Sequence, residues 1–363
     1  MTRPERILVV NVGSTSVKLR VIGDGDQLEA SRDLPSLPEL GPDRLDAELA
    51  DLGPVDAVGH RVVHGGDAFT APVLLDAKVV AALRDLTDLA PLHQPPALDA
   101  IDAIGGSLPG VPAVACFDTA FHATLPPAAS TYALPATWRK LGVRRYGFHG
   151  LAHAWTSRRA AAVAGNGAAR VVTCHLGGGA SLAAVDGGRC VDTTMGFTPL
   201  EGLVMGTRSG TVDPGAVLWL LQHQGLSADE VADRLEHASG LVGLCGTSDM
   251  REITARAGAG ETAAATAVAV YVHRLRAAIA AMTASLGGLD VLVFSGGVGE
   301  RSAPVRAATA AGLGFLGVEV DGARNRNARG DERISPLSAA VIVFVIEARE
   351  DLEIAAGVRG VLG

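Results

Sequence analysis

The feature that most constrains the fold of this chain is a strand–turn–strand unit that occurs twice. In the first copy, ILVVNVG and VKLRVI are two β-branched strands joined by the polar turn Gly13–Ser16. The second copy is VVTCHLGGGASLAAV, and it places His175 in the position of Asn11 and Gly177 in that of Gly13. An internal repeat of this kind predicts two homologous lobes that face one cleft.

A third glycine cluster, VLVFSGGVGE, follows an unbroken apolar run from Val291. Such a run is typical of a strand that is buried on both faces, and the glycines predict a passage from strand to helix. Helical periodicity fills the intervals between strands, which predicts α/β layering. The predicted helices are Pro42–Leu52, Asp76–Leu89, His153–Ala164, Ser227–His237 with a Ser227/Glu230 capping box, and the Ala-rich Glu261–Leu286, whose apolar face suits a sheet or a partner subunit.

The length of the chain predicts more than one domain. It has 363 residues, 48% of them apolar, which is too much for one ordinary core. Two prolines close DTAFHATLPP, so we expect a lobe junction near residues 119–125 and a return crossing near Glu350. The predicted N-terminal lobe is 1–122 plus 351–363, and the predicted C-terminal lobe is 123–350.

Charge and composition exclude several classes of protein. A net charge of -8 without a basic stripe argues against a role at nucleic acids or membrane surfaces. MTRPERILVV lacks a signal-peptide core, and every apolar run is well short of the roughly 20 residues of a membrane span, so we expect a cytoplasmic protein. Cys116, Cys174, Cys190 and Cys245 form no CxxC pair, which favours buried thiols over disulfides or a zinc site.

Three side chains that can carry positive charge lie in Gly-flanked segments. Arg208 lies in TRSG, Arg61 in GHRVVHGG and His149 in RRYGFHG. Two arginines and a histidine that are aimed by tight turns could form a site for transfer of an anion. The alternatives are solvated loop arginines and a hydrogen-bonded core histidine, and His93 and His175 share the second ambiguity.

The glycine-rich turns favour phosphate binding, because backbone N–H groups without side chains can approach an anion closely. GxxxxGK[ST] is absent, and no GxGxxG follows a strand in a dinucleotide arrangement, so neither a P-loop nor a Rossmann site is supported. Lys18, just past the first turn, is either a phosphate ligand or a solvated strand residue. Asp118 and Glu350 follow apolar runs, where a carboxylate is costly unless paired or near a metal such as Mg²⁺; Glu350 could equally be a helix-start glutamate.

As a set, these segments resemble the acetate kinase family within the acetate and sugar kinase/actin superfamily. The resemblance runs nearly end to end, through NVGSTSVKLRVI, GHRVVHGG, LAPLHQPP, FDTAFH, RRYGFHG, HLGGGAS, MGFTPLEGLVMGTRSG, SDMRE, FSGGVGE and EDLEIA. It implies a two-lobed actin-like (ribonuclease H-like) duplicated fold with the active-site cleft between the lobes. It further implies reversible, Mg²⁺-dependent phosphoryl transfer from ATP to acetate by direct in-line transfer. It also implies a homodimer formed through the second lobe, in which the long Ala-rich helix could form the interface.

The resemblance also implies roles for individual residues. The catalytic residues would be Arg61, Asp118, His149 and Arg208. The metal would be positioned by Asn11 and Glu350. The pocket for the acid would be lined by Val63, Leu92, His93, Phe148 and Pro199. ATP and its phosphates would be bound by Ser14, Ser16, Lys18, His175, Gly177, Gly178, Gly179, Asp249, Met250, Arg251, Gly297 and Val298.

Several residues depart from the family pattern. Gly178 replaces the asparagine that acetate enzymes usually carry, and butyrate kinases have a glycine-rich turn here. The other departures are Gln94, Thr211, Arg301 and the pair Ala348–Arg349, and the chain is shortened mostly between Arg20 and Gly59. They leave open a propionate or butyrate kinase of the same family, a catalytically silent actin-like nucleotide-binding regulator, and a pyrophosphate-linked kinase.

Overall fold

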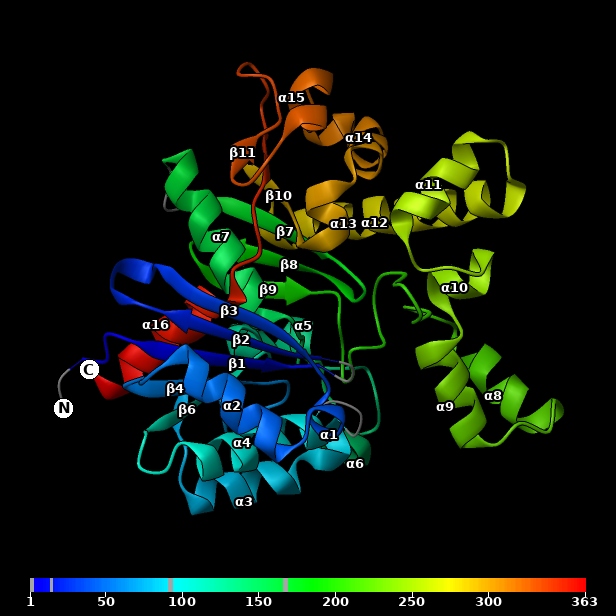
Figure 1. Ribbon diagram of the computed structural model, residues 1–363. Helices are drawn as coiled ribbons and strands as arrows, with labels where there is room; N and C mark the ends of the chain where they lie inside the picture. Colours follow the sequence, from blue (N-terminus) through cyan, green and yellow to red (C-terminus); the bar gives the residue numbers. More distant parts are fainter. Residues whose placement is uncertain (1–2, 14–15, 91–93, 166–168) are drawn as a thin grey trace. The chain divides into compact units, whose positions relative to one another are not determined.

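The computed structural model describes residues 3–13, 16–90, 94–165 and 169–363, and Figure 1 shows its elements. The chain divides into two compact units. The first comprises Met1–Ala123, Phe148–Trp155 and Arg349–Gly363, and the second comprises Thr124–Gly147 and Thr156–Ala348. Phe148–Trp155 thus groups with the first unit, whereas the predicted boundaries place it in the C-terminal lobe.

The first unit is built on a six-stranded mixed sheet with the order β3-β2-β1-β4-β6-β5. Its strands are β1 (Ile7–Val12), β2 (Ser16–Ile22), β3 (Leu28–Pro35), β4 (Ala57–Val62), β5 (Val73–Leu74) and β6 (Ala113–Phe117). β1 pairs antiparallel with β2 and parallel with β4, which pairs parallel with β6. The predicted pairing of the first two strands is therefore confirmed.

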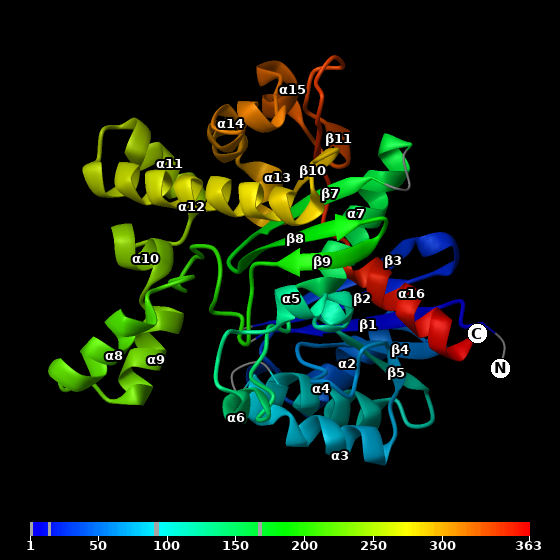
Figure 2. The same ribbon diagram turned by 180° about the vertical axis from the view of Figure 1, so that it is seen from behind.

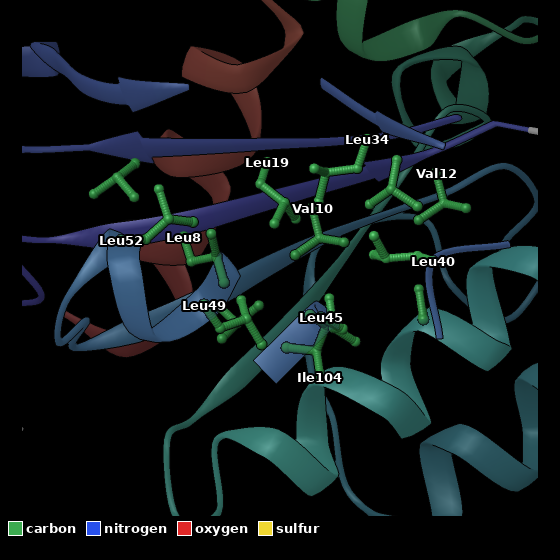
Figure 3. Packing of buried hydrophobic residues seen from close by; sticks show 14 residues of the cluster. Leu8, Val10, Val12, Leu19, Leu34, Leu40, Leu45, Leu49, Leu52 and Ile104 are labelled. Carbon is green, nitrogen blue, oxygen red and sulfur yellow. The ribbon is translucent and has the colours of Figure 1, made fainter. Parts of the chain in front are cut away.

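Helices cover both faces of this sheet. They are α1 (Leu37–Leu40), α2 (Pro42–Leu52), α3 (Ala77–Asp85), α4 (Gln94–Ser107) and α16 (Glu350–Leu362), with the 3₁₀ turns η1 (Asp24–Asp26), η2 (Thr87–Leu89) and η3 (Ala120–Thr124). Successive residues of a strand point to opposite faces, so β1 serves two layers. Leu8 and Val10 join the cluster with α2 and α4 that Figure 3 shows, while Ile7 and Val9 pack with α16.

The second unit contains a six-stranded sheet with the order β11-β12-β10-β7-β8-β9. Its strands are β7 (Arg170–Leu176), β8 (Ala180–Asp186), β9 (Arg189–Thr193), β10 (Val291–Ser295), β11 (Glu332–Arg333) and β12 (Ile342–Val345). β10 is buried along its whole length and leads directly into a helix, as predicted. The first residue of this helix, Gly296, has a positive φ of 75°.

The helices of the second unit pack on its sheet and on one another. They are α5 (Pro127–Ser130), α6 (Ala136–Arg139), α8 (Pro214–His223), α9 (Ala228–His237), α10 (Gly240–Cys245), α11 (Met250–Gly258), α12 (Thr262–Leu286), α13 (Gly296–Arg301), α14 (Ala303–Ala311), the 3₁₀ turn η4 (Gly314–Leu316) and α15 (Gly322–Asn327). α12 contacts β8 and β9, as Figure 2 shows. Its buried residues, among them Ala264, Ala267, Tyr271 and Leu275, recur every three or four positions, so the predicted apolar face is buried within the second unit, against the sheet and against α10, α11 and α14.

The two sheets have the same topology. β1, β2, β3, β4, β6 and β5 correspond to β7, β8, β9, β10, β12 and β11 in both order and direction. When Asn11 is matched to His175, the parallel pairing of the strands matches Arg61 to Ser295. The next strands then match Cys116 to Ile346, so two residues further along Asp118 corresponds to Ala348. The predicted duplicated α/β fold is confirmed.

Most predicted helices lie where the pattern put them, including α9 with its Ser227/Glu230 capping box. Two differ at an end. α3 stops at Asp85, and the rest of its predicted span is the 3₁₀ turn η2. α7 (Gly150–Ala164), which continues from the first unit into the second, begins three residues before His153, at a glycine that is a poor helix former and gives no start signal.

All four cysteines are buried and none forms a disulfide, as predicted. Across the residues that the structure describes, no helix is long and apolar enough to cross a membrane.

Candidate active site

Four polar side chains meet at one edge of the first sheet. Asn11 lies in β1, Arg61 in β4, Asp118 directly after β6, and Glu350 at the start of α16. Because β1, β4 and β6 run parallel, their carboxyl ends share an edge, which is where open α/β sheets bind ligands. We call these four residues the strand-end cluster.

The strand-end cluster is joined by hydrogen bonds. Arg61 donates from Nη2 to Asp118 Oδ2 at 2.5 Å, and its Nε lies 3.1 and 3.2 Å from the two oxygens of the same carboxylate. Arg61 Nη1 also donates to Asn11 Oδ1 at 3.1 Å, and Asn11 Nδ2 donates to Glu350 Oε2 at 3.0 Å. The Asp118 side chain is only 1% exposed, whereas those of Arg61 and Glu350 are 17% and 18% exposed and remain accessible to a ligand.

Burial sets the protonation equilibria of this cluster. It raises the pKa of the Asp118 carboxyl to about 6; the Arg61 guanidinium opposes this shift and the Glu350 carboxylate adds to it. Burial alone would lower the pKa of Arg61, but the carboxylates of Asp118 and Glu350 raise it above its usual value. Arg61 is therefore a permanent cation beside a carboxylate that can titrate near neutrality.

The cluster offers oxygen donors to a cation: two carboxylates and the amide oxygen of Asn11. Within the described residues, no group of three or more His, Cys, Asp or Glu could hold a metal ion. This donor set suits Mg²⁺, which binds through one or two carboxylates together with water and substrate phosphates, better than it suits zinc. Glu350 is also the first residue of α16, as the alternative interpretation of a helix-start glutamate predicted.

Phe148 and His149 lie directly before α7, in the first unit. His149 has a φ of 57°, a left-handed conformation that is uncommon for a residue other than glycine. Gly150 N donates to the carbonyl of Asp118 at 2.9 Å, which ties this turn to the strand-end cluster. The ring of Phe148 is buried edge-on to that of His64 at a centroid distance of 5.6 Å, and the neighbouring Val63 is also buried.

Arg208 is held within the second unit rather than lying in solvent. Its Nε is 3.0 Å from Glu236 Oε2 on α9, and its Nη1 donates to the carbonyl of Pro199 at 3.3 Å. Both side chains of the ion pair are about one-fifth exposed or less. Gly240 makes this possible, because its φ is 60° and a Cβ there would lie 2.6 Å from the carbonyl oxygen of Arg208.

The second glycine turn closes with a hydrogen bond from Gly177 N to Gly179 O at 2.8 Å. It lies beside the start of α13, since a Cβ on Gly177 would be 4.0 Å from Gly297 N. Gly178 O accepts from Gly206 N at 2.9 Å, which joins the turn to the loop of Arg208. Backbone groups of three predicted segments thus come together around this turn.

The remaining predicted residues of the second unit have local partners. Asp249 caps α11 by accepting from Arg251 N at 2.9 Å, and its ion pair with the Arg251 side chain lowers its pKa to about 2. Met250 is buried, whereas Arg251 and Gly297 are exposed and Val298 is partly buried.

His175 Nδ1 lies 3.5 Å from Ser295 Oγ. In the first unit, Lys18 is exposed on β2 opposite Asn11, and Ser16 begins that strand. Ser14, Leu92 and His93 lie outside the described residues.

Three further supporting residues were not found by sequence reasoning. Glu236 and Gly240 hold Arg208, and Glu300 Oε1 accepts from Gly296 N at 2.9 Å and Ala348 N at 3.1 Å. Glu300 follows the glycines of VLVFSGGVGE, so its motif was visible although its role was not. Glu236 and Gly240 had no signal, because a charge on an amphipathic helix and a glycine just after such a helix are ordinary features.

Two residues that depart from the family pattern have structural roles. Gln94 is buried and bonds both backbone groups of His64, accepting from its N at 3.3 Å and donating to its O at 3.1 Å. Thr211 bonds Gly202 through its backbone N at 3.0 Å and through its hydroxyl at 3.1 Å. Both substitutions are therefore accommodated by hydrogen bonds within their own units.

The fold matches solved structures of an acetate kinase and a propionate kinase. A crystal structure of Porphyromonas gingivalis acetate kinase covers 99% of this chain and 100% of its own, with 35% identity and a TM-score of 0.91. A propionate kinase from Francisella tularensis gives the same identity, TM-score and coverage. These likenesses define the structural class as that of the acetate and propionate kinases.

The family follows from the sequence comparisons. The model of the acetokinase family matches residues 43–356. Acetate kinase of Nostoc punctiforme is 49% identical over 314 residues, covering 85% of this chain and 78% of its own, and that of Streptomyces avermitilis is 44% identical over 400 positions, covering 99% and 98%. The chain belongs to the acetokinase family, and it is accordingly a kinase, that is, a phosphotransferase.

Proposed function

We propose that this protein is an ATP:carboxylate phosphotransferase that transfers the terminal phosphoryl group of ATP reversibly to acetate, giving acetyl phosphate and ADP. The observation that carries the proposal is the strand-end cluster, in a chain that belongs to the acetokinase family. A permanent cation beside two carboxylates and an amide oxygen is the chemistry that an anionic substrate and a phosphate-bound cation require.

In the proposed reaction two arginines and two histidines stabilise negative charge and do not act as nucleophiles. Arg61 and Arg208 bracket the carboxylate and the phosphoryl group, and His149, with His175, donates to the phosphoryl oxygens. Phosphoryl transfer passes through a loose, in-line transition state, so positioning and positive charge supply the catalysis. Acetate is already ionised at neutral pH and needs no general base.

We propose that Mg²⁺ is held near Asn11 and Glu350, with Asp118 close by. The ion would neutralise charge that develops on the phosphate oxygens. The donor set supports Mg²⁺ rather than a softer metal, because all of its groups are oxygens.

The two units would divide the binding. Ser14, Ser16 and Lys18 would face phosphate from the first unit. The turn Gly177–Gly179, together with Asp249, Met250, Arg251, Gly297 and Val298, would bind ATP from the second. The acid would meet Val63, Leu92, His93, Phe148 and Pro199. We further propose a homodimer formed through the second unit, and a cytoplasmic location.

The test is an acyl hydroxamate assay with ATP and Mg²⁺, comparing acetate, propionate, butyrate and no acid, with pyrophosphate as the alternative donor. The proposal expects the highest rate with acetate and no product without ATP. A variant with Arg208→Ala should lose about 10³- to 10⁵-fold in kcat while it remains folded, as arginines that stabilise phosphoryl transfer do. If this variant turned over as fast as the wild type, the proposed function would be wrong.

A propionate or butyrate kinase is the second candidate. Gly178 favours it, because a glycine-rich turn at this place resembles that of butyrate kinases, whereas acetate enzymes usually carry an asparagine there. A Cβ at Gly178 would meet no atom within 4 Å apart from the glycine itself and its two chain neighbours. The likeness to a propionate kinase, equal to that for an acetate kinase, supports the same alternative. Size exclusion by an apolar pocket discriminates by only about 1 to 3 kcal/mol per methylene, so the assay ranks the acids instead of selecting one.

A silent nucleotide-binding regulator is the candidate from another class. The joint presence of Arg61, Asp118, Asn11 and Glu350 in one hydrogen-bonded cluster argues against it, because nucleotide binding alone does not call for a cation paired with a buried carboxylate whose pKa is raised. Absence of acyl phosphate with every acid would restore it.

A further inference from the structure

His122, the last residue of FDTAFH, has no part in the proposed chemistry, yet it is 1% exposed in the first unit. Its Nε2 lies 3.0 Å from the carbonyl oxygen of Phe148. A carbonyl oxygen only accepts hydrogen bonds, so His122 carries a proton on Nε2 and donates it to Phe148. The donor is thus directed at the peptide group immediately before His149.

His149 is the residue that this peptide group leads into, and its backbone is strained. A left-handed φ of 57° is unfavourable for a residue with a Cβ, so it persists only where neighbouring groups hold it. Two hydrogen bonds flank it: His122 to Phe148 O on one side and Gly150 N to Asp118 O, at 2.9 Å, on the other.

Gly150 is needed for the second of these bonds. A Cβ at this position would lie 2.1 Å from Asp118 O, which no side chain can tolerate without movement of the backbone. Both partners therefore lie on one short segment, 118–122, whose Asp118 side chain also binds Arg61. The segment supports the cation of the strand-end cluster and the backbone of His149 together.

We propose that His122 is a positioning residue that fixes the left-handed conformation of His149 and thereby the place from which its imidazole acts. The inference rests on the proposed function through the role of His149 in phosphoryl transfer. It adds a residue that touches neither substrate nor nucleotide but on which the rate depends.

The test compares two amide variants of the same residue. His122→Gln keeps a donor that reaches about as far as Nε2, whereas His122→Asn ends one methylene short. We expect kcat to fall about 10²-fold in His122→Asn, the usual cost of a displacement near 1 Å, with KM values within about threefold, and to recover to within about tenfold in His122→Gln. Equal kcat values in the two variants, measured well below the Tm of each, would overturn the proposal.

His60→Leu is the matched control. His60 is also a buried histidine of the first unit, but neither of its ring nitrogens has a hydrogen-bond partner among the described residues. Its replacement removes a histidine but no hydrogen bond to a described residue, so kcat should stay within about twofold of the wild type. A loss as large as that of His122→Asn would show that any disturbance of this core slows the enzyme, and would overturn the assignment to His122.

A double-mutant cycle separates positioning from a general loss of order. In a His149→Ala background, His122→Asn should lower kcat by no more than about threefold further, because the group that it positions is already gone. Full additivity would contradict the proposal.

Hydrogen exchange tests the same point without activity. Amides of residues 148–153 should exchange faster in His122→Asn than in His122→Gln or the wild type. If the wild type makes no acyl phosphate, the proposed function fails while this exchange result still decides the positioning role. Unchanged exchange in His122→Asn would overturn it.

Discussion

The two sheets of this protein share a topology but carry different chemistry at matching strand ends. In the first sheet the carboxyl ends of the parallel strands hold Arg61, near the end of β4, and Asp118, directly after β6, which form a bidentate ion pair. The matching positions in the second sheet hold Ser295, a neutral hydroxyl, and Ala348, whose backbone N–H is bound by Glu300. The strand pattern determines the fold, and a few residues at the ends of the strands determine the chemistry. The two copies of a duplicated fold can therefore differ, with charged side chains at one and neutral groups at the other.

The sharpest way to break this comparison is to remove the cation from the first edge and the hydroxyl from the second. We expect Arg61→Ala to lower kcat/KM about 10³-fold, since it removes a preorganised positive charge. Ser295→Ala should cost no more than about threefold, because its hydrogen bonds at 3.4 and 3.5 Å are long. Steady-state kinetics of both variants test this prediction. Similar losses of kcat/KM in the two variants would mean that the two strand ends do not differ in their contribution to catalysis.

Arg61→Ala should also destabilise the first unit, by about 3 to 5 kcal/mol when the Asp118 carboxylate is left buried and charged. Protonation of Asp118 would remove this buried negative charge, and burial already raises the pKa of Asp118 to about 6. For a carboxyl whose native pKa lies above its unfolded value, stability falls as pH rises towards that native pKa, and loss of Arg61 moves this pKa higher still. The Tm difference from wild type should therefore be larger at pH 8 than at pH 5.5.

A second test uses the titration of the first edge. If Asp118 acts as a carboxylate, log(kcat/KM) should fall with unit slope as pH drops below about 6, because this parameter reports the free protein. Asp249 in the second unit, with a pKa lowered to about 2, should add nothing in this range. The profile of Asp118→Asn should be low and flat. An unchanged acidic limb in that variant would assign the limb to another group.

The sequence predicts the elements of this fold better than it predicts the contacts at its candidate site. The strands, their glycine turns and α2, α9 and α12 were predictable, because alternation, capping and helical periodicity are local signals. The pairing of Arg61 with Asp118 joins residues 57 positions apart, and that of Arg208 with Glu236 joins a loop to α9, so no local pattern predicts them. The start of α7 was missed because the left-handed turn at His149 is stabilised by His122 and Asp118, which lie far from it in the sequence.

A third test concerns the cation of the second unit, which has its own counter-ion. Glu236→Gln keeps a hydrogen-bond acceptor for Arg208 but removes the charge, so we expect kcat/KM to fall about 3- to 10-fold. Asp233→Asn on the same helix is the control, since its side chain is exposed and bonds no described group. In an Arg208→Ala background, Glu236→Gln should have no further effect. A loss that persists there would show that Glu236 acts on something other than Arg208.

The smallest expected effect separates two glycines of the second unit. Gly178 has open space where a side chain would begin, so Gly178→Asn should leave Tm within about 2 °C and alter mainly the KM for ATP, by about tenfold or less. Gly296 is its counterpart: its φ is 75° and a Cβ would lie 2.8 Å from Leu176 O, so Gly296→Asn should destabilise the unit. Steady-state kinetics and thermal melting of both variants check this. A tighter KM for ATP with an unchanged preference among acids would show that Gly178 affects the nucleotide alone, whereas a shift of preference towards acetate would make the turn a determinant of the acid.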